Sequence, residues 1–155
     1  MLDLPAILAA HAEWLRDHSR GTRACFKKAD LNGLDLNRVD LRRADLRVAE
    51  LRRANLSGAN LLGAVLVEAD LREANLTGAN LTGADLLTAN LTGANLTGAN
   101  LTNAMVWHAN LTGANLTDAN LTNALFSHAD LTGANLTGAN TEGCDMANVK
   151  GYPHA

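Results

Sequence analysis

The feature that most constrains the fold is a period of five residues that runs without an insertion from Ala24 to Asn148. This stretch divides into 25 consecutive pentads, in which the third residue is Leu in 20 pentads and the first residue is Ala in 22. The second residue is usually Asn or Asp, the fourth is often Thr or Arg, and the fifth is often Gly. An α-helix repeats about every 3.6 residues and a coiled coil about every 3.5, so neither fits this period.

The spacing of the two apolar positions predicts a short strand in every pentad. Side chains of a strand alternate between its two faces, so the first and third residues of a pentad point the same way, which we expect to be inward. Gly at the fifth position suits a bend with a positive φ. Each unit can bury its apolar side only against the next coil, which predicts an all-β solenoid of the β-helix type.

The interior of this solenoid is expected to be thin and regular. Aromatic residues make up only 3% of the chain, so Ala and Leu must fill the core, and few large side chains are available for irregular gaps. The residues that represent the expected structural core occupy third positions. They are Phe26, Leu31, Leu36, Leu46, Leu66, Leu86, Val106, Phe126 and Met146.

Runs such as 89–93 (Ala-Asn-Leu-Thr-Gly) and 94–98 (the same five residues) resemble the tandem A-(D/N)-L-x-x units of the pentapeptide-repeat family. The resemblance covers about four-fifths of the chain. It implies a right-handed quadrilateral β-helix with four pentads in each coil, and therefore about six coils here. At roughly 4.8 Å per coil, the rod would be about 30 Å long.

The irregular pentads support four pentads per coil independently. Apolar residues replace the usual pattern at 65–67, 105–107 and 125–126, which lie at multiples of 20 residues, and Leu86 with Leu87 fills the gap between them. Residues 20 apart would stack on one face of a square solenoid. The irregular residues should therefore gather on a single face.

The two ends differ from the repeat. Residues 4–17 have helical apolar spacing, with Asp3 as the expected N-cap, Pro5 in the first turn and Gly21 as the expected exit. We interpret residues 1–23 as a capping helix and leader, 24–149 as the β-helix and 150–155 as a short tail. Tyr152 and Pro153 could cover the last coil, and end-to-end dimerisation through that coil is the alternative.

The irregular face is the best candidate for a binding surface. An exposed, contiguous apolar patch usually marks a protein contact or self-association, and Trp and Met are typical of an interface centre. Two alternatives are that the N-terminal leader covers this face and that the apolar residues reflect drift. The candidate interface residues are Val48, Val65, Val67, Leu87, Met105, Trp107 and Leu125, whereas Leu62 is a lone apolar residue on another face.

Two further groups of side chains were considered. His108 and His128 should stack about 5 Å apart, but no third metal ligand is evident, which favours exposed histidines. The first coils carry a basic belt that could contact phosphates, although acidic residues lie among its members and favour local salt bridges. The belt comprises Lys27, Lys28, Arg38, Arg42, Arg43, Arg47, Arg52, Arg53 and Arg72.

The sequence gives no sign of catalysis. We find no nucleophile beside a base in a plausible cleft, no metal-ligand spacing and no phosphate-binding glycine motif, which predicts a protein that is not an enzyme and needs no cofactor. No apolar run reaches 18 residues and no secretory signal begins the sequence, which favours a cytoplasmic protein with reduced Cys25 and Cys144.

We therefore expect a structural or interaction protein that binds a protein partner or a second copy of itself. The alternative comes from the family resemblance, since some members resemble B-form DNA and occupy the DNA site of DNA gyrase. That role implies a strongly acidic rod, whereas residues 1–73 hold 12 of the 13 Lys and Arg and most candidate positions are Asn. Direct binding of nucleic acid or of a membrane is not expected.

Overall fold

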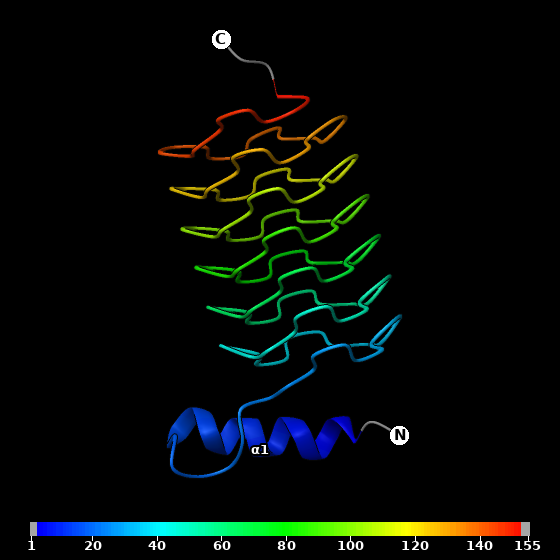
Figure 1. Cartoon of the computed structure of the whole chain (residues 1–155), viewed down its shortest axis with the longest axis vertical. Helices are drawn as coiled ribbons and strands as arrows, with labels where there is room; N and C mark the ends of the chain where they lie inside the picture. Colours follow the sequence, from blue (N-terminus) through cyan, green and yellow to red (C-terminus); the bar gives the residue numbers. More distant parts are fainter. Residues whose placement is uncertain (1–2, 153–155) are drawn as a thin grey trace.

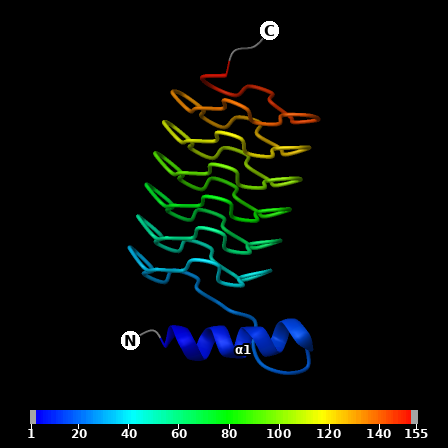
Figure 2. The ribbon, with the colours of Figure 1, turned by 180° about the vertical axis from the view of Figure 1, so that it is seen from behind.

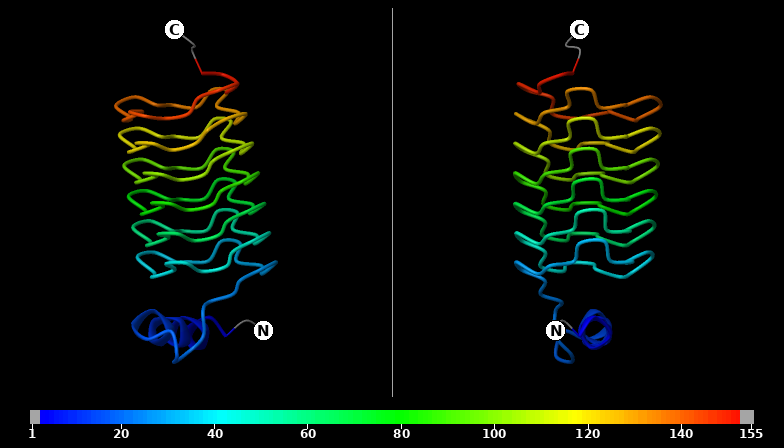
Figure 3. Two further views of the ribbon diagram at one scale, coloured as in Figure 1. Left: turned by 60° about the vertical axis from the view of Figure 1, so that its left-hand side comes forward. Right: turned by 90° about the vertical axis from the view of Figure 1, so that its right-hand side faces the viewer.

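The computed structural model describes residues 3–152, which form one helix, α1, and a solenoid that rises from it (Figure 1). Parallel β-bridges join residues 20 positions apart along the whole solenoid, from Cys25–Asp45 to Asp130–Lys150. One coil therefore contains four pentads, as the spacing of the irregular pentads predicted. Seen from the side, the coils stack directly above one another, so each pentad lies over its counterpart in the previous coil (Figure 3).

The short strands expected from the sequence are reduced to isolated bridges within residues 3–152. Only the second residue of each pentad makes a bridge, because the fourth and fifth residues already form a turn. Backbone N–H groups nevertheless bond from coil to coil. For example, Leu91 N donates to Asn110 O at 2.7 Å, and Gly93 N donates to Thr112 O at 2.9 Å. The wall is thus a parallel β-helix whose strands are interrupted by a turn in every pentad.

Ala and Leu fill the interior, with most of these side chains 0–1% exposed. Of the third-position residues singled out from the sequence, all are buried except Met146, which is only partly buried. Met146 lies in the last complete pentad, so within the described residues little chain stacks above it. The core is one continuous column that runs through all the coils.

The N-terminal helix α1 (Leu4–Arg16) begins as the sequence predicted. The Asp3 side chain is the N-cap and accepts a hydrogen bond from Ala6 N at 3.1 Å, with Pro5 in the first turn. The helix ends at Arg16 with Asp17 as an extended C-cap, so the expectation that Gly21 forms the exit was wrong. Gly21 instead lets the chain return beneath the helix, since a Cβ there would lie 2.2 Å from Ala10 O.

Helix α1 lies across the N-terminal end of the solenoid rather than along its side (Figures 1 and 2). Leu4, Ile7 and Leu8 pack against the core. His11 is fully buried at this contact, where its Nδ1 accepts a hydrogen bond from Ala24 N at 3.1 Å, and burial lowers the pKa of its imidazole. This placement excludes the alternative in which the N-terminal segment covers the apolar face.

At the opposite end, Tyr152 is partly buried and packs against the core, while Pro153 lies outside the described residues. Among residues 3–152, no helix has the length and apolar character needed to traverse a bilayer.

Candidate functional site

One side of the solenoid differs from the other three in nearly every outward position. Its pentads begin at residues 24, 44, 64, 84, 104, 124 and 144, and bridges through their second residues join them into one column. We call this column the variable face and the other three columns the regular faces. On the regular faces of the later coils, the second residue is almost always Asn and the fourth almost always Thr.

The candidate interface residues all lie on the variable face, where their outward positions form an apolar stripe. Trp107 is 40% exposed and Val48 is 36% exposed, and these are the most exposed members. The remaining members are half-buried between neighbouring coils; they are Val65, Val67, Leu87, Met105 and Leu125. The stripe is therefore a low surface centred on Trp107. Leu62, 37% exposed, stands apart on a regular face.

The variable face is also distinguished by its backbone. Every fifth position of the solenoid, 28–148, has a positive φ, and the regular faces relieve this conformation with Gly at most of their fifth positions. The variable face has no Gly there. Its fifth residues are Lys28, Val48, Glu68, Thr88, His108, His128 and Asn148, with φ between 55° and 61°. An L-residue in this region costs roughly 1–2 kcal/mol, and β-branched residues such as Val48 and Thr88 rarely adopt it.

His108 and His128 occupy successive fifth positions of the variable face and stack as the sequence predicted. Their ring centroids are 4.9 Å apart and the planes differ by 5°. An imidazole nitrogen binds a metal along a lone pair in the ring plane, so two parallel rings cannot both direct a lone pair at one ion. Within residues 3–152, no group of three or more His, Cys, Asp or Glu could hold a metal.

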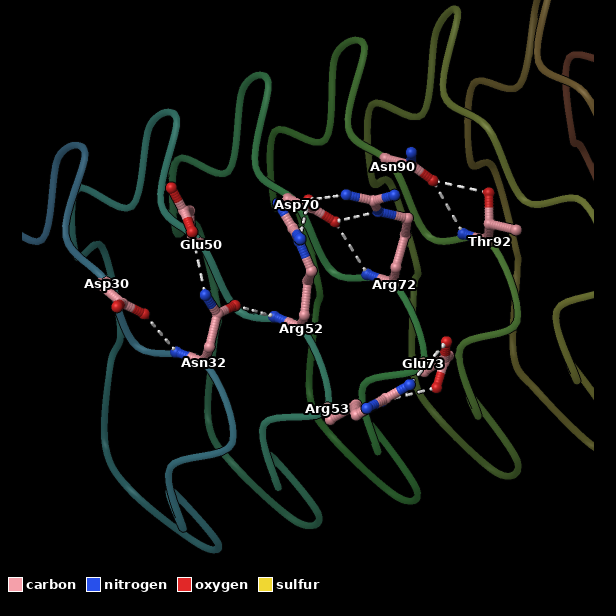
Figure 4. A network of polar contacts seen from close by, with 10 residues as sticks. All are labelled: Asp30, Asn32, Glu50, Arg52, Arg53, Asp70, Arg72, Glu73, Asn90 and Thr92. Carbon is pink, nitrogen blue, oxygen red and sulfur yellow. Dashed lines mark hydrogen bonds and ion pairs between the residues drawn. The ribbon is translucent and has the colours of Figure 1, made fainter.

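The basic belt is largely neutralised by neighbouring carboxylates (Figure 4). Asp70 accepts from Arg72 Nη2 at 2.6 Å and from Arg52 Nε at 2.7 Å, and Arg53 Nε pairs with Glu73 at 2.8 Å. The guanidinium of Arg72, followed by that of Arg52, lowers the pKa of Asp70 to about 2. These side chains stay charged and mutually paired at neutral pH.

The same pairing continues toward the first coil, where Arg42 bonds to Asp40 and Arg47 bonds to Asp45. Arg47 lowers the pKa of Asp45 to about 2. Only four members of the belt make no ion pair within the described residues, namely Lys27, Lys28, Arg38 and Arg43. The belt is thus chiefly a set of local salt bridges on a solvated surface.

A groove of about 510 Å³ lies within this network, lined by Asn32, Gly33, Arg52, Arg53, Arg72 and Glu73. Asn32 Nδ2 donates to Glu50 at 2.9 Å, and its Oδ1 accepts from the backbone N of Arg52 at 2.8 Å (Figure 4). Because the arginines that line the groove already bind carboxylates, an anion would have to displace them. The variable face is therefore the stronger candidate site.

Sequence reasoning located the apolar stripe but missed the backbone feature. The absence of Gly from the fifth positions at 28, 48, 68, 88, 108, 128 and 148 is visible in the sequence once residues are aligned every 20 positions. It acquires a physical meaning only with the positive φ observed at all of them. The two cysteines are free; Cys25 lies on the variable face and is exposed.

Comparison with known proteins places the fold. The family model described as Pentapeptide repeats matches in 8 copies, over residues 24–61, 49–86, 88–118 and 109–150. A search of curated proteins found no match.

Solved structures of pentapeptide-repeat proteins are similar to the chain. A protein from the thylakoid lumen of Arabidopsis thaliana is 38% identical, with a TM-score of 0.61 over 63% of this chain and 68% of that one. Rfr23 from the cyanobacterium Cyanothece 51142 is 37% identical, with a TM-score of 0.46 over 78% and 90%. QnrB1, a plasmid-mediated fluoroquinolone resistance protein, is 22% identical, with a TM-score of 0.52 over 79% and 67%. The last likeness concerns the fold alone.

Proposed function

The chain belongs to the pentapeptide-repeat family, whose fold is a right-handed quadrilateral β-helix, and from this premise we propose that it is a non-catalytic interaction protein that binds through its variable face. The binding unit would be the repeat region 24–149, with 1–23 as its cap and 150–155 as its tail. The partner would be another protein or a second copy of this chain. A cytoplasmic location is part of the same proposal.

The observation that carries the proposal is the combination of apolar side chains and unrelieved positive φ on one face. Gly would relieve the backbone at each fifth position of the variable face, as it does at most fifth positions elsewhere. Energetically unfavourable conformations tend to cluster at functional sites. The apolar stripe beside them has Trp107 at its centre, and Trp is among the residues that most often dominate an interface.

Replacement of Trp107 and Leu87 by Asp tests the proposal. Both changes put charge on the stripe while leaving the buried Leu86 and Val106 in place. We expect the double variant to lose partner binding in a pull-down from the native host, or to lose self-association in sedimentation. The matched control is Thr92→Asp with Thr112→Asp on a regular face. Equal binding by both double variants, with unchanged circular dichroism, would refute the proposal.

Mimicry of DNA is the less supported alternative. It needs a continuous acidic surface, yet the second positions of the later coils are mostly Asn and the early carboxylates are paired with arginines. A DNA gyrase supercoiling assay checks this alternative, and we expect no inhibition by the purified protein.

A further inference from the structure

The fourth residue of each pentad has a backbone N–H group that the solenoid does not satisfy by itself. In the interior coils the first, second, third and fifth N–H groups all donate to backbone carbonyls, either within the turn or in an adjacent coil. The fourth N–H has no such carbonyl. Its hydrogen bond must therefore come from a side chain, from water or from a bound molecule.

On the regular faces a side chain supplies this bond. In every pentad whose second residue is Asp or Asn, Oδ1 of that residue accepts from the fourth N–H, as in an Asx turn; Thr92 N donates to Asn90 Oδ1 at 3.1 Å (Figure 4). At Glu50 the side chain differs, and Asn32 from the previous coil supplies the oxygen for Arg52 N.

Four pentads between residues 24 and 148 lack such an oxygen, and all four lie on the variable face. Their second residues are Cys25, Val65, Met105 and Leu125. Their fourth residues accordingly have N–H groups with no hydrogen bond in the structure; these are Lys27, Val67, Trp107 and Ser127. The apolar substitutions that create the stripe therefore also free backbone donors.

Val67 and Trp107 are both members of the apolar stripe, two coils apart, or about 10 Å along the axis. Leu87 lies between them, but its N–H is already bound to Asp85 Oδ1 at 3.1 Å. A partner that covered the stripe without offering acceptors would bury two unpaired donors, at about 1–3 kcal/mol each. A partner that binds tightly must therefore present hydrogen-bond acceptors at these two points.

The charge at the centre of the stripe indicates which acceptors fit. Asp85 stands in the column between Val65 and Met105 and makes no ion pair within residues 3–152. A phosphate or carboxylate seated on the stripe would lie about one coil from this carboxylate and be repelled. Neutral oxygens are not repelled, and the commonest neutral acceptor beside apolar side chains is the backbone carbonyl.

We infer that the variable face binds an apolar polypeptide segment whose carbonyl oxygens accept hydrogen bonds from the backbone N–H groups of Val67 and Trp107. This inference rests on the proposed function and adds the chemistry of the partner. Recognition would combine apolar contact along Val67, Leu87 and Trp107 with two backbone hydrogen bonds. The stripe excludes acidic segments through Asp85.

The test uses peptides selected from a displayed library of short random peptides on the full-length protein. We retain a peptide whose binding is lost in the variant Trp107→Asp with Leu87→Asp. Amide hydrogen exchange is then followed by NMR with and without that peptide. The amides of Val67 and Trp107 should exchange at least about tenfold more slowly in the complex, as hydrogen bonding predicts. Those of Lys27 and Ser127, which flank the central stripe, should not change.

A regularising variant provides the second arm. Val65→Asn with Met105→Asn would restore the internal Asx bond to both N–H groups, and we expect peptide affinity to fall about tenfold or more. Val65→Ala with Met105→Ala removes apolar surface without adding an acceptor, and should reduce affinity less. Because the Asn pair follows the pattern of the regular faces, it should fold at least as well as the Ala pair.

The outcomes separate the two proposals. If a stripe-dependent peptide binds but the exchange of Val67 and Trp107 is unchanged, the hydrogen-bonding inference is wrong and the proposed function stands. If the Ala pair weakens binding as much as the Asn pair, the inference is also wrong. If no selected peptide depends on Trp107 and Leu87, the proposed function fails and this inference fails with it.

Discussion

The variable face and the regular faces enclose the same interior but treat their exterior in opposite ways. Both bury Ala and Leu almost completely, and both have a positive φ at every fifth residue. The regular faces use Gly at most fifth positions and an Asx bond at every fourth N–H of their pentads up to residue 148, apart from Arg52, which uses Asn32. The variable face has no Gly at its fifth positions, and four of its Asx bonds are missing.

This difference teaches that the architecture and the outer surface are separable. A narrow core and a coil-to-coil ladder are enough to build the wall, because they are common to all four faces. Asx bonds and glycines then lower the free energy of the wall where nothing else is required of it. Where they are lacking, the side chains that replace them are the ones that could contact a partner.

The largest expected effect concerns the shared interior. Leu86→Ala on the variable face and Leu91→Ala on a regular face should each lower the free energy of unfolding by about 2–5 kcal/mol, because both side chains are 0% exposed. Urea denaturation followed by circular dichroism measures both. A difference above about 1 kcal/mol between the two variants would show that the faces also differ inside.

The next effect concerns the Asx bond of the regular faces. Asn80 Oδ1 accepts from Thr82 N at 3.1 Å and from Thr82 Oγ1 at 2.7 Å. Asn80→Ala should destabilise the protein by about 1–2 kcal/mol, since it leaves Thr82 N without its partner. Asn80→Asp keeps an acceptor oxygen and serves as the control in the same denaturation experiment. Equal losses in both variants would mean that the second residue contributes nothing through this bond.

A smaller pair of changes exchanges the fifth residues of the two kinds of face. Gly78 has φ 63° and open space around the position of a Cβ, so Gly78→Glu should cost about 1 kcal/mol through the backbone alone. Glu68 has φ 57° on the variable face and is exposed. Glu68→Gly should accordingly stabilise by up to about 1 kcal/mol. Thermal unfolding should show melting temperatures that move in opposite directions, and shifts of the same sign would contradict the comparison.

The smallest effect divides the regular faces into charged early coils and neutral later ones. Asp70 has a pKa of about 2 in the folded chain, below its ordinary value of 3.8, because Arg72 and Arg52 bond to its carboxylate. Its stabilisation is therefore present above pH 3.8 and is lost as the pH falls through about 2. The Asp70–arginine contacts are partly exposed, so we expect less than about 1 kcal/mol.

The variant Asp70→Asn isolates this contribution. Its unfolding free energy should lie below that of the wild type near neutral pH, and the gap should close as the solution approaches pH 2. Denaturation at a series of pH values measures the gap. A gap that stays constant through the acid range would show that the carboxylate of Asp70 is not the titrating group.

The sequence by itself determined the solenoid, its core and the stacking of residues 20 apart, because a five-residue period is local and repeats without interruption. It also predicted the start of α1 from Asp3 and Pro5 and brought the stripe residues onto one face. Only the tertiary structure decided where α1 lies, since its apolar side could have packed on the stripe as well as on the open end of the first coil.

The tertiary structure also decided which backbone groups remain unpaired. Whether the N–H of Val67 or Trp107 finds a carbonyl depends on the position of the adjacent coil, and whether Arg52 N finds Asn32 depends on a contact across 20 residues. Hydrogen bonds need both distance and direction in space, and the order of residues in the chain specifies neither until the coils have stacked.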